Sequence, residues 1–265
     1  MKMKKLYWIF ALILIMSSCD IIPEDQFLKE VPNPPMERVV LLEDYTGQKC
    51  VNCPNAATEI DLLSEIFGKN MIVVAIHAGV FSIPNMQTDA GNAYNDYFNI
   101  ISYPKGLVNR RIYNSEQTLE HNIWGQAIRD IIWKKSGVSI NIDNNYNSSS
   151  NLLNLTVQVE KEPDLDITNL SLQIWITENK LVKPQAMPDG TYDMNYVHNH
   201  VLRDAPNGTW GTSLLFKNNV AEFTLSDFSL KDKDWQFKNC DIIAFVYNEE
   251  NKEVLESIKI PLTNQ

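Results

Sequence analysis

The pattern of apolar and polar positions changes character about halfway along the chain, after residue 136. Before that point, continuous apolar runs alternate with segments whose apolar residues recur every three or four positions. Continuous runs are typical of strands covered on both faces, and the recurring spacing is typical of amphipathic helices. The order strand, helix, strand, helix, strand, helix predicts an α/β domain. The predicted strands are residues 38–45, residues 71–77 and a short strand after Pro104, and the predicted helices are residues 56–67, 89–98 and 116–135.

From residue 138 onward the chain consists of short strand-like runs, and the loops between them are rich in Asn, Asp, Ser and Pro. Several runs alternate apolar and polar residues strictly, as residues 153–159 do. Short strands with polar turns and no helix predict an antiparallel β-sandwich. Residues 184–211 form a long irregular excursion inside this part, and such insertions often carry function. The predicted strands are residues 138–142, 152–159, 167–177, 220–225, 241–247 and 254–260.

The N-terminus has the layout of an export signal. Three lysines lie within the first five residues, residues 6–16 are unbroken apolar, and Ser17, Ser18 and Cys19 follow at once. Eleven apolar residues are too few to span a bilayer, so a secretory signal peptide is predicted. A cysteine directly after the small residues resembles a bacterial lipoprotein signal, in which Cys19 becomes the acylated first residue. A plain signal peptide with an incidental cysteine is the alternative. The proline-rich segment that follows indicates an extended tether.

Charge excludes two classes of partner. The chain carries a formal net charge of −10, and removal of the signal would take three lysines and no acidic residue with it. This sign is wrong for holding nucleic acid or an anionic lipid surface. We therefore expect a protein held at a membrane by lipid, with no nucleic-acid partner. The sequence contains no glycine-rich phosphate loop and no nucleophile elbow, and we expect no cofactor.

The strongest chemical motif is Cys50-Val51-Asn52-Cys53, which follows a predicted strand and precedes a predicted helix. A Cys-x-x-Cys motif in this context is typical of a redox pair. Unpaired amides and the positive dipole end at the start of the helix would stabilise a Cys50 thiolate. Cys53, one turn later and more buried, would resolve a mixed disulfide. A structural or vestigial disulfide is the alternative.

Three other features carry expectations of their own. A proline after an aromatic residue and before a strand makes Tyr103–Pro104 a candidate for a cis peptide bond. Cys240 lies in a strand-like apolar run, where a small buried hydrophobe is expected rather than a reactive thiol. His198 and His200 would face the same way in an extended chain and could form a metal site with the Cys pair. Because the two pairs are far apart in the sequence, we interpret these histidines as surface or loop-anchoring residues and expect no metal.

The first half of the chain resembles the thioredoxin superfamily over residues 37–136, on the evidence of the Cys-x-x-Cys motif, the order of elements and Tyr103-Pro104. The resemblance implies that Cys50 is the catalytic nucleophile and Cys53 the resolving thiol. It also implies that Pro104 is a cis-proline that faces the disulfide and holds substrate backbone. The chain departs from the family pattern because no tryptophan precedes Cys50 and the intervening pair is Val-Asn.

The whole layout resembles a narrower group, the outer-membrane lipoproteins of Bacteroidetes-type bacteria that join a thioredoxin-like domain to an immunoglobulin-like β-sandwich domain. The segments that carry this resemblance are residues 47–54, 103–110, 198–203 and 240–247. It implies a lipoprotein signal peptide, a tether, a thioredoxin-like domain and an immunoglobulin-like domain, at residues 1–18, 19–36, 37–136 and 137–265.

Two functions follow from this resemblance. The first is a lipid-anchored cell-envelope protein that performs thiol–disulfide exchange on exported proteins. The second is a non-catalytic binding or structural lipoprotein, adhesin-like or receptor-like, that uses the thioredoxin-like domain as a scaffold. In both, the partners are other exported or envelope proteins. The membrane is reached through the Cys19 lipid, at the periplasmic face or the cell surface of the outer membrane.

Overall fold

Strand β1 (Val40–Thr46) lies inside the molecule, and all seven of its residues are buried. A computed structural model describes residues 35–263. The predicted signal peptide, Cys19 and nearly all of the predicted tether lie outside the described residues. Within the described part, the helices are few and most of the ordered chain is strand. No described helix has both the length and the apolar character needed to cross a membrane.

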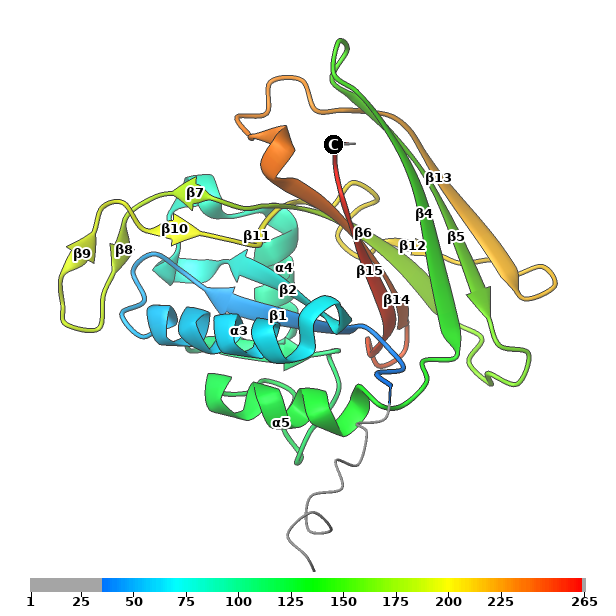
Figure 1. The fold of residues 1–265 in the computed structure, drawn as a ribbon, viewed down its shortest axis with the longest axis horizontal. Coiled ribbons are helices and arrows are strands. Elements are labelled where there is room, and N and C mark those ends of the chain that lie inside the picture. The colour runs from blue at the N-terminus through cyan, green and yellow to red at the C-terminus, as the bar shows by residue number, and fades with distance from the viewer. Residues whose placement is uncertain (1–34, 264–265) are drawn as a thin grey trace, which may run out of the picture. The chain divides into compact units, whose positions relative to one another are not determined.

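One mixed eight-stranded sheet contains β1 and runs through both halves of the chain (Figure 1). Strand β1 is parallel to β2 and antiparallel to β3, and β11 joins β2 to β6. The strand order is β15-β14-β6-β11-β2-β1-β3, with β12 paired to β6. The predicted domain boundary after residue 136 falls between α5 and β4, and strands from both sides of it share this sheet. The division into two domains stays a prediction. The bounds are β2 (Met71–His77), β3 (Lys105–Val108), β6 (Leu170–Glu178), β11 (Val201–Asp204), β12 (Thr212–Ser213), β14 (Cys240–Asn248) and β15 (Val254–Pro261).

A second, three-stranded antiparallel sheet has the order β13-β5-β4. Alternate residues of β5 are buried, so one face of this sheet is apolar. That face packs on β6 and β14 of the large sheet, and the two sheets share one hydrophobic core. The pattern in the sequence predicted where each of these strands begins, but β4 and β13 continue past their predicted ends at residues 142 and 225. Their bounds are β4 (Val138–Asn147), β5 (Leu152–Lys161) and β13 (Val220–Ser229).

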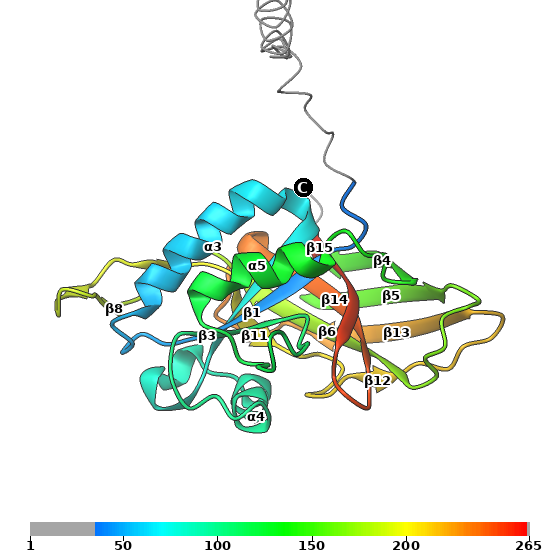
Figure 2. The ribbon, with the colours of Figure 1, turned by 90° about the horizontal axis from the view of Figure 1, so that it is seen from below.

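The helices cover both faces of the β1–β2 region, which explains why these strands are buried throughout and mostly apolar (Figure 2). Helices α3 (Cys53–Phe67) and α5 (His121–Ile131) pack on one face, through residues such as Ile60 and Trp124. Helix α4 (Asp89–Tyr97) packs on the other, through Tyr94. Helix α5 begins later than predicted, because residues 116–120 form bridges to Tyr113 and Gly106 instead.

The segment predicted as an irregular excursion, residues 184–211, contains several short strands. Strands β8 (Gln185–Ala186) and β9 (Tyr192–Asp193) form a small hairpin. Strand β10 (Val197–His198) pairs with β7 (Leu181–Val182), and β11 enters the large sheet beside β2. The expectation of an irregular segment is therefore wrong. Strands of two residues carry no readable periodicity, and β11 is held by a strand far away in the sequence.

Candidate thiol–disulfide site

Cys50 and Cys53 form a disulfide between the carboxyl end of β1 and the start of α3, with their Cα atoms 5.5 Å apart. The loop between strand and helix is tight, because the amide of Cys50 donates to the carbonyl of Gly47 at 3.0 Å. Helix α3 begins at Cys53, with Asn52 as its N-cap and Pro54 in its first turn. Cys50 thus precedes the helix, whereas the sequence pattern predicted that it would open it.

Strand register brings the predicted proline to the same edge of the sheet. Tyr45 of β1 is opposite Lys105 of β3, so Pro104 lies level with the end of β1, where the loop to Cys50 begins. The Tyr103–Pro104 peptide bond is cis, as predicted. Contact between Pro104 and the two sulfur atoms stays a prediction.

One side of the cysteine loop packs against residues 79–83. The amide of Lys49 donates to the carbonyl of Phe81 at 2.8 Å, and the hydroxyl of Ser82 donates to Oε1 of Gln48 at 3.1 Å. A Cβ atom on Gly47 would lie 2.5 Å from the backbone of Phe81. Only glycine allows the two backbones to approach this closely.

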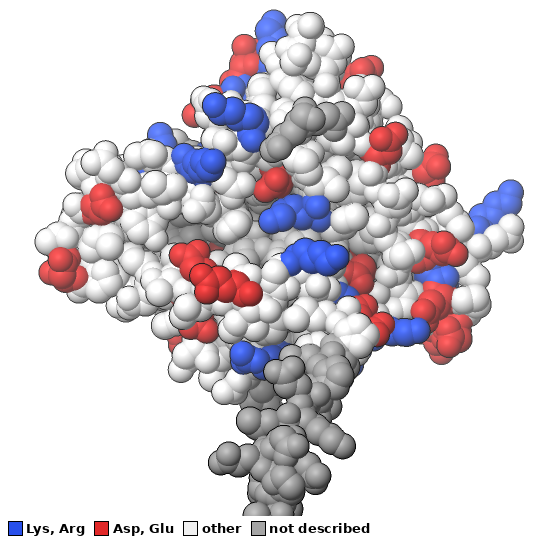
Figure 3. All heavy atoms as spheres, viewed as in Figure 1, with Lys and Arg blue, Asp and Glu red and all other residues white. Residues whose placement is uncertain are grey.

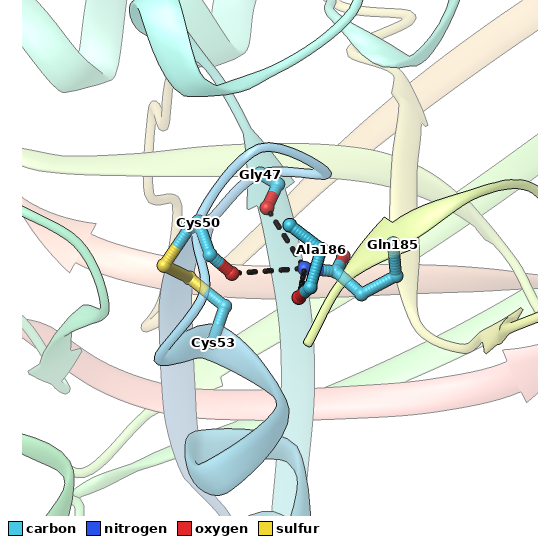
Figure 4. Close-up of a disulfide and its surroundings, with 5 residues drawn as sticks. All are labelled: Gly47, Cys50, Cys53, Gln185 and Ala186. Atoms are coloured by element: carbon cyan, nitrogen blue, oxygen red, sulfur yellow. Dashed lines mark hydrogen bonds between the residues drawn. A yellow bond between two sulfur atoms is a disulfide. The ribbon is translucent and has the colours of Figure 1, made fainter. Parts of the chain in front are cut away.

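The other side of the loop is covered by strand β8. The amide of Ala186 donates to the carbonyl of Gln48 at 2.8 Å. The side-chain amide of Gln185 donates to the carbonyl of Cys50 at 2.9 Å and reaches the carbonyl of Gly47 at 3.4 Å (Figure 4). Sequence reasoning missed Gln185, because nothing local to it indicates that it meets the cysteine loop.

The two cysteines are equally buried, and each is 4% exposed. The prediction that Cys53 would be more buried than Cys50 is wrong. Residues 79–83 and strand β8 both pack against the loop that carries Cys50, so this residue is no more exposed than Cys53 at the start of α3.

Beside the disulfide lies a cavity of about 100 Å³, lined by Cys53 of α3, Asp44 of β1, His77 of β2 and His198 of β10. The carboxyl of Asp44 is buried, and desolvation raises its pKa to about 7. Among the residues that the structure describes, Oδ1 of Asp44 has no hydrogen-bond partner. Asp44 was also missed from the sequence, although an acidic residue inside a fully buried strand is the signal that would have found it.

His77 and His198 meet in this cavity with their ring centroids 5.3 Å apart, edge to face. Burial lowers the pKa of His77 well below its ordinary value and lowers that of His198 to about 4. Both rings are therefore neutral at neutral pH. Within residues 35–263, neither Nδ1 of His77 nor Nε2 of His198 has a hydrogen-bond partner.

The sequence-based interpretation of His198 as a surface residue is wrong, since it is 5% exposed. His200 lines the same cavity, but its φ of 59° breaks the extended chain on which the two side chains would face the same way. In the described part of the chain, no three His, Cys, Asp or Glu residues are arranged to hold a metal ion. Cys240 is a free, buried thiol as predicted, and burial raises its pKa to about 12.

A larger cavity, of about 620 Å³, lies away from the disulfide, between the segment leading into β1 and the start of β4. Arg38 lines this cavity, and its guanidinium donates to the backbone carbonyls of Lys134 and Lys135, each at 2.6 Å. These two hydrogen bonds are structural. Charges of both signs are interspersed over the face of the molecule in Figure 3, without an extended surface of either sign. We therefore place the candidate site at the disulfide.

Two solved structures share this fold over most of the chain. The protein HBP35 of Porphyromonas gingivalis superposes with a TM-score of 0.71 at 16% identity, over 88% of this chain and 80% of that one. Protein AGR_C_4864 of Agrobacterium tumefaciens gives a TM-score of 0.54 at 9% identity, over 87% and 98%. A domain of the outer membrane lipoprotein Omp28 of P. gingivalis is 23% identical over 49% of this chain and 90% of its own, with a TM-score of 0.34.

No curated protein matches the chain. A family model does match it, over residues 91–264, and its description is outer membrane protein Omp28. The matched region begins within α4 and therefore leaves out the Cys50–Cys53 motif, but it covers more than half of the sequence. The protein is thus located in the outer membrane. The chain belongs to the Omp28 family of outer membrane proteins.

Proposed function

We propose that the protein is an outer-membrane lipoprotein, anchored through an acylated Cys19, that exchanges disulfides with other exported proteins. In this proposal residues 37–136 form a thioredoxin-like domain and residues 137–265 an immunoglobulin-like β-sandwich domain. The order of elements from β1 to α5, the likeness of the fold to HBP35 and the packing of two sheets in the second half support it.

The observation that carries the exchange function is the disulfide between β1 and α3 with a buried acid beside it. An incoming thiolate attacks Sγ of Cys50, the sulfur–sulfur bond breaks, and Cys53 leaves as a thiolate. Asp44, whose pKa of about 7 keeps it partly protonated, supplies a proton to Cys53. A second client thiolate then attacks the mixed disulfide at the client sulfur and releases Cys50. The two electrons of the client dithiol end on the cysteine pair, and the client leaves as a disulfide.

The buried state of both sulfurs adds a step to this reaction. At 4% exposure, a protein thiolate reaches Cys50 only after the β8–β9 hairpin has moved. The hairpin has two paired positions of its own, and a few hydrogen bonds from Gln185 and Ala186 hold it to the cysteine loop. Short elements of this kind open locally at low free-energy cost. Access to the disulfide is therefore restricted but not closed.

The same burial favours a second candidate function. A disulfide whose loop packs between residues 79–83 and β8 also fits a purely structural cross-link. In this alternative the protein is a non-catalytic binding or structural lipoprotein, adhesin-like or receptor-like. Its thioredoxin-like domain is then a scaffold, and the sandwich contacts the partner.

Two measurements distinguish the exchange function from the scaffold function. They are the reduction potential of Cys50–Cys53 and turnover in a protein-disulfide reduction assay. Exchange proteins lie between about −270 and −120 mV, whereas structural disulfides lie below about −300 mV. We expect a potential in the first range, with turnover that Cys50→Ser abolishes. The matched control is Cys240→Ser, which removes a buried thiol far from the motif and should keep turnover. A potential below the exchange range without turnover contradicts the exchange function and supports the scaffold.

A further inference from the structure

Three side chains that line one small cavity each carry a buried polar atom without a hydrogen-bond partner among residues 35–263. These atoms are Oδ1 of Asp44, Nδ1 of His77 and Nε2 of His198, and the cavity wall also contains Cys53. Burying a polar group without a partner costs free energy, so native proteins rarely gather three such groups at one place. Packing alone does not account for them.

The cavity has the size and polarity to hold water. Its volume of about 100 Å³ is several times larger than the roughly 10–15 Å³ that one water molecule needs. Three unpaired donors and acceptors provide the partners that buried water requires. The wall leads outward from the buried Cys53 and Asp44 to half-exposed Tyr196 and exposed Asn199.

We propose that His77 and His198 form a proton relay, through water, between the Cys53–Asp44 pair and solvent. The physiological use of the relay rests on the proposed exchange function. A neutral imidazole accepts a proton at one nitrogen and releases one from the other, so it passes a proton without holding a lasting charge. Cys53 is only 4% exposed, and in this proposal the two imidazoles and the water between them supply its route to solvent.

Burial is the main cause that keeps both rings neutral between transfers. Besides burial, His198 and Arg203 lower the pKa of His77, and Lys259 acts in the same direction on His200. Hydrogen bonding to the backbone carbonyls of Lys183 and Pro184 raises the pKa of His198 and offsets part of the effect of burial. The remaining titratable groups at the wall are Asp44, Cys53, exposed Asp61 and Tyr196, whose ring centroid is 4.8 Å from that of His198.

The proton balance of one reduction step is complete. When a thiolate attacks Cys50, the electron pair of the broken bond stays on Cys53. Cys53 takes the proton of Asp44, which becomes a buried carboxylate at the cavity wall. The relay then delivers one proton from solvent to Asp44, as one imidazole nitrogen gains a proton and the other gives one up. The cavity ends with its starting charge.

The test is the rate at which dithiothreitol reduces Cys50–Cys53 in the full chain, measured by acid quench and alkylation in H₂O and in D₂O. The variants are His77→Gln and His198→Gln, which stay polar but cannot relay. His121→Gln, on α5 and outside the cavity, is the matched control. We expect both cavity variants to be slower by about tenfold near pH 7, with a solvent isotope effect larger than that of the wild type.

Rates equal to those of the control, or slower rates without a larger isotope effect, overturn the proposal. If neither glutamine variant folds, the wild type is measured in H₂O–D₂O mixtures instead. A relay of several protons gives a curved dependence on the deuterium fraction, and a straight line contradicts it. Because the reductant is a small molecule, the result does not depend on client turnover. If the histidine variants show the expected slower reduction but the wild type does not turn over protein disulfides, only the exchange function is contradicted. If the wild type turns over protein disulfides but the histidine variants are reduced at the rate of the control, only the relay is contradicted.

Discussion

The side-chain amide of Gln185 donates a hydrogen bond to the backbone carbonyl of Cys50 across 2.9 Å, although 135 positions separate the two residues in the sequence. This contact joins the second half of the chain to the loop that carries the disulfide. It holds β8 against the backbone of Cys50.

Replacing Gln185 with alanine should make the disulfide easier to reach. Loss of the hydrogen bonds from Gln185 to the loop weakens this contact by at least about 1 kcal/mol, so reduction by dithiothreitol should be at least about fivefold faster. Gln117→Ala is the control, because that side chain donates to the backbone of Arg110 and has no bond to the cysteine loop. Equal reduction rates for Gln185→Ala and the wild type would mean that β8 does not limit access.

The pH dependence of stability should depend on Asp44. Its folded pKa of about 7 lies above the ordinary value of 3.8, so the native state binds more protons than the unfolded state between about pH 4 and 7. The stability that this group contributes is present at low pH and is lost as the pH rises through that window. At 1.36 kcal/mol per pKa unit, the loss in the free energy of unfolding is up to about 4 kcal/mol.

Asp44→Asn should therefore gain stability over the wild type at about pH 8 and little at about pH 4. Urea unfolding at the two pH values measures this. The buried histidines have lowered pKa values, so their contribution to stability changes with pH in the opposite direction. Because they are present in both the wild type and Asp44→Asn, they do not affect the comparison. An identical gain or loss at both pH values would show that the carboxyl of Asp44 is not desolvated as described.

A buried ion pair joins β1 to the turn after β3. Nε of Arg110 lies 2.6 Å from Oε1 of Glu43, and the two side chains are 1% and 0% exposed. The guanidinium also lies within 6 Å of five aromatic rings, those of Tyr94, Phe98, Trp175, Phe245 and Tyr247. These rings come from both halves of the chain.

Glu43→Gln should destabilise the protein by about 3–5 kcal/mol, because it leaves the Arg110 charge buried without its partner. The matched control is Glu120→Gln, which breaks the ion pair with Lys105 at a carboxylate that is 56% exposed and should cost less than about 1 kcal/mol. Denaturant unfolding compares the two. Similar losses for the buried and the exposed pair would contradict this account of Arg110.

Membrane attachment should depend on Cys19. Cys19→Ser should release the protein from the membrane fraction and block processing by the lipoprotein pathway, since the acylated cysteine is the proposed anchor. Cys240→Ser should stay membrane-bound. Unchanged fractionation and normal processing of Cys19→Ser would remove the anchor from the account.

The sequence predicted those parts of the fold whose signal is local. Strand β2 was predicted at its observed bounds, because its apolar run is continuous from Met71 to His77. The cysteine motif and the cis peptide before Pro104 were found from motif and residue type alone. Strands β8 to β11 were not found, because each has two to four residues and is held by distant parts of the chain.

The surroundings of the motif were missed for the same reason. Gln185 and His198 reach the disulfide region only through the tertiary fold, and no pattern near them in the sequence indicates it. Asp44 did carry a signal, because it follows Glu43 as a second acidic residue inside a strand that begins with an apolar run. Its position beside Cys53 depends on how β1 and α3 pack.

Trapping of mixed disulfides by Cys53→Ser tests the exchange function most directly. Without the resolving thiol, a client bound to Cys50 stays attached. Envelope proteins captured by this variant are separated on non-reducing gels and identified after reduction, with Cys50→Ser and the wild type as controls. The account predicts adducts that accumulate through Cys50 in Cys53→Ser and are absent from Cys50→Ser. No adducts with Cys53→Ser, or equal amounts in both variants, would contradict it.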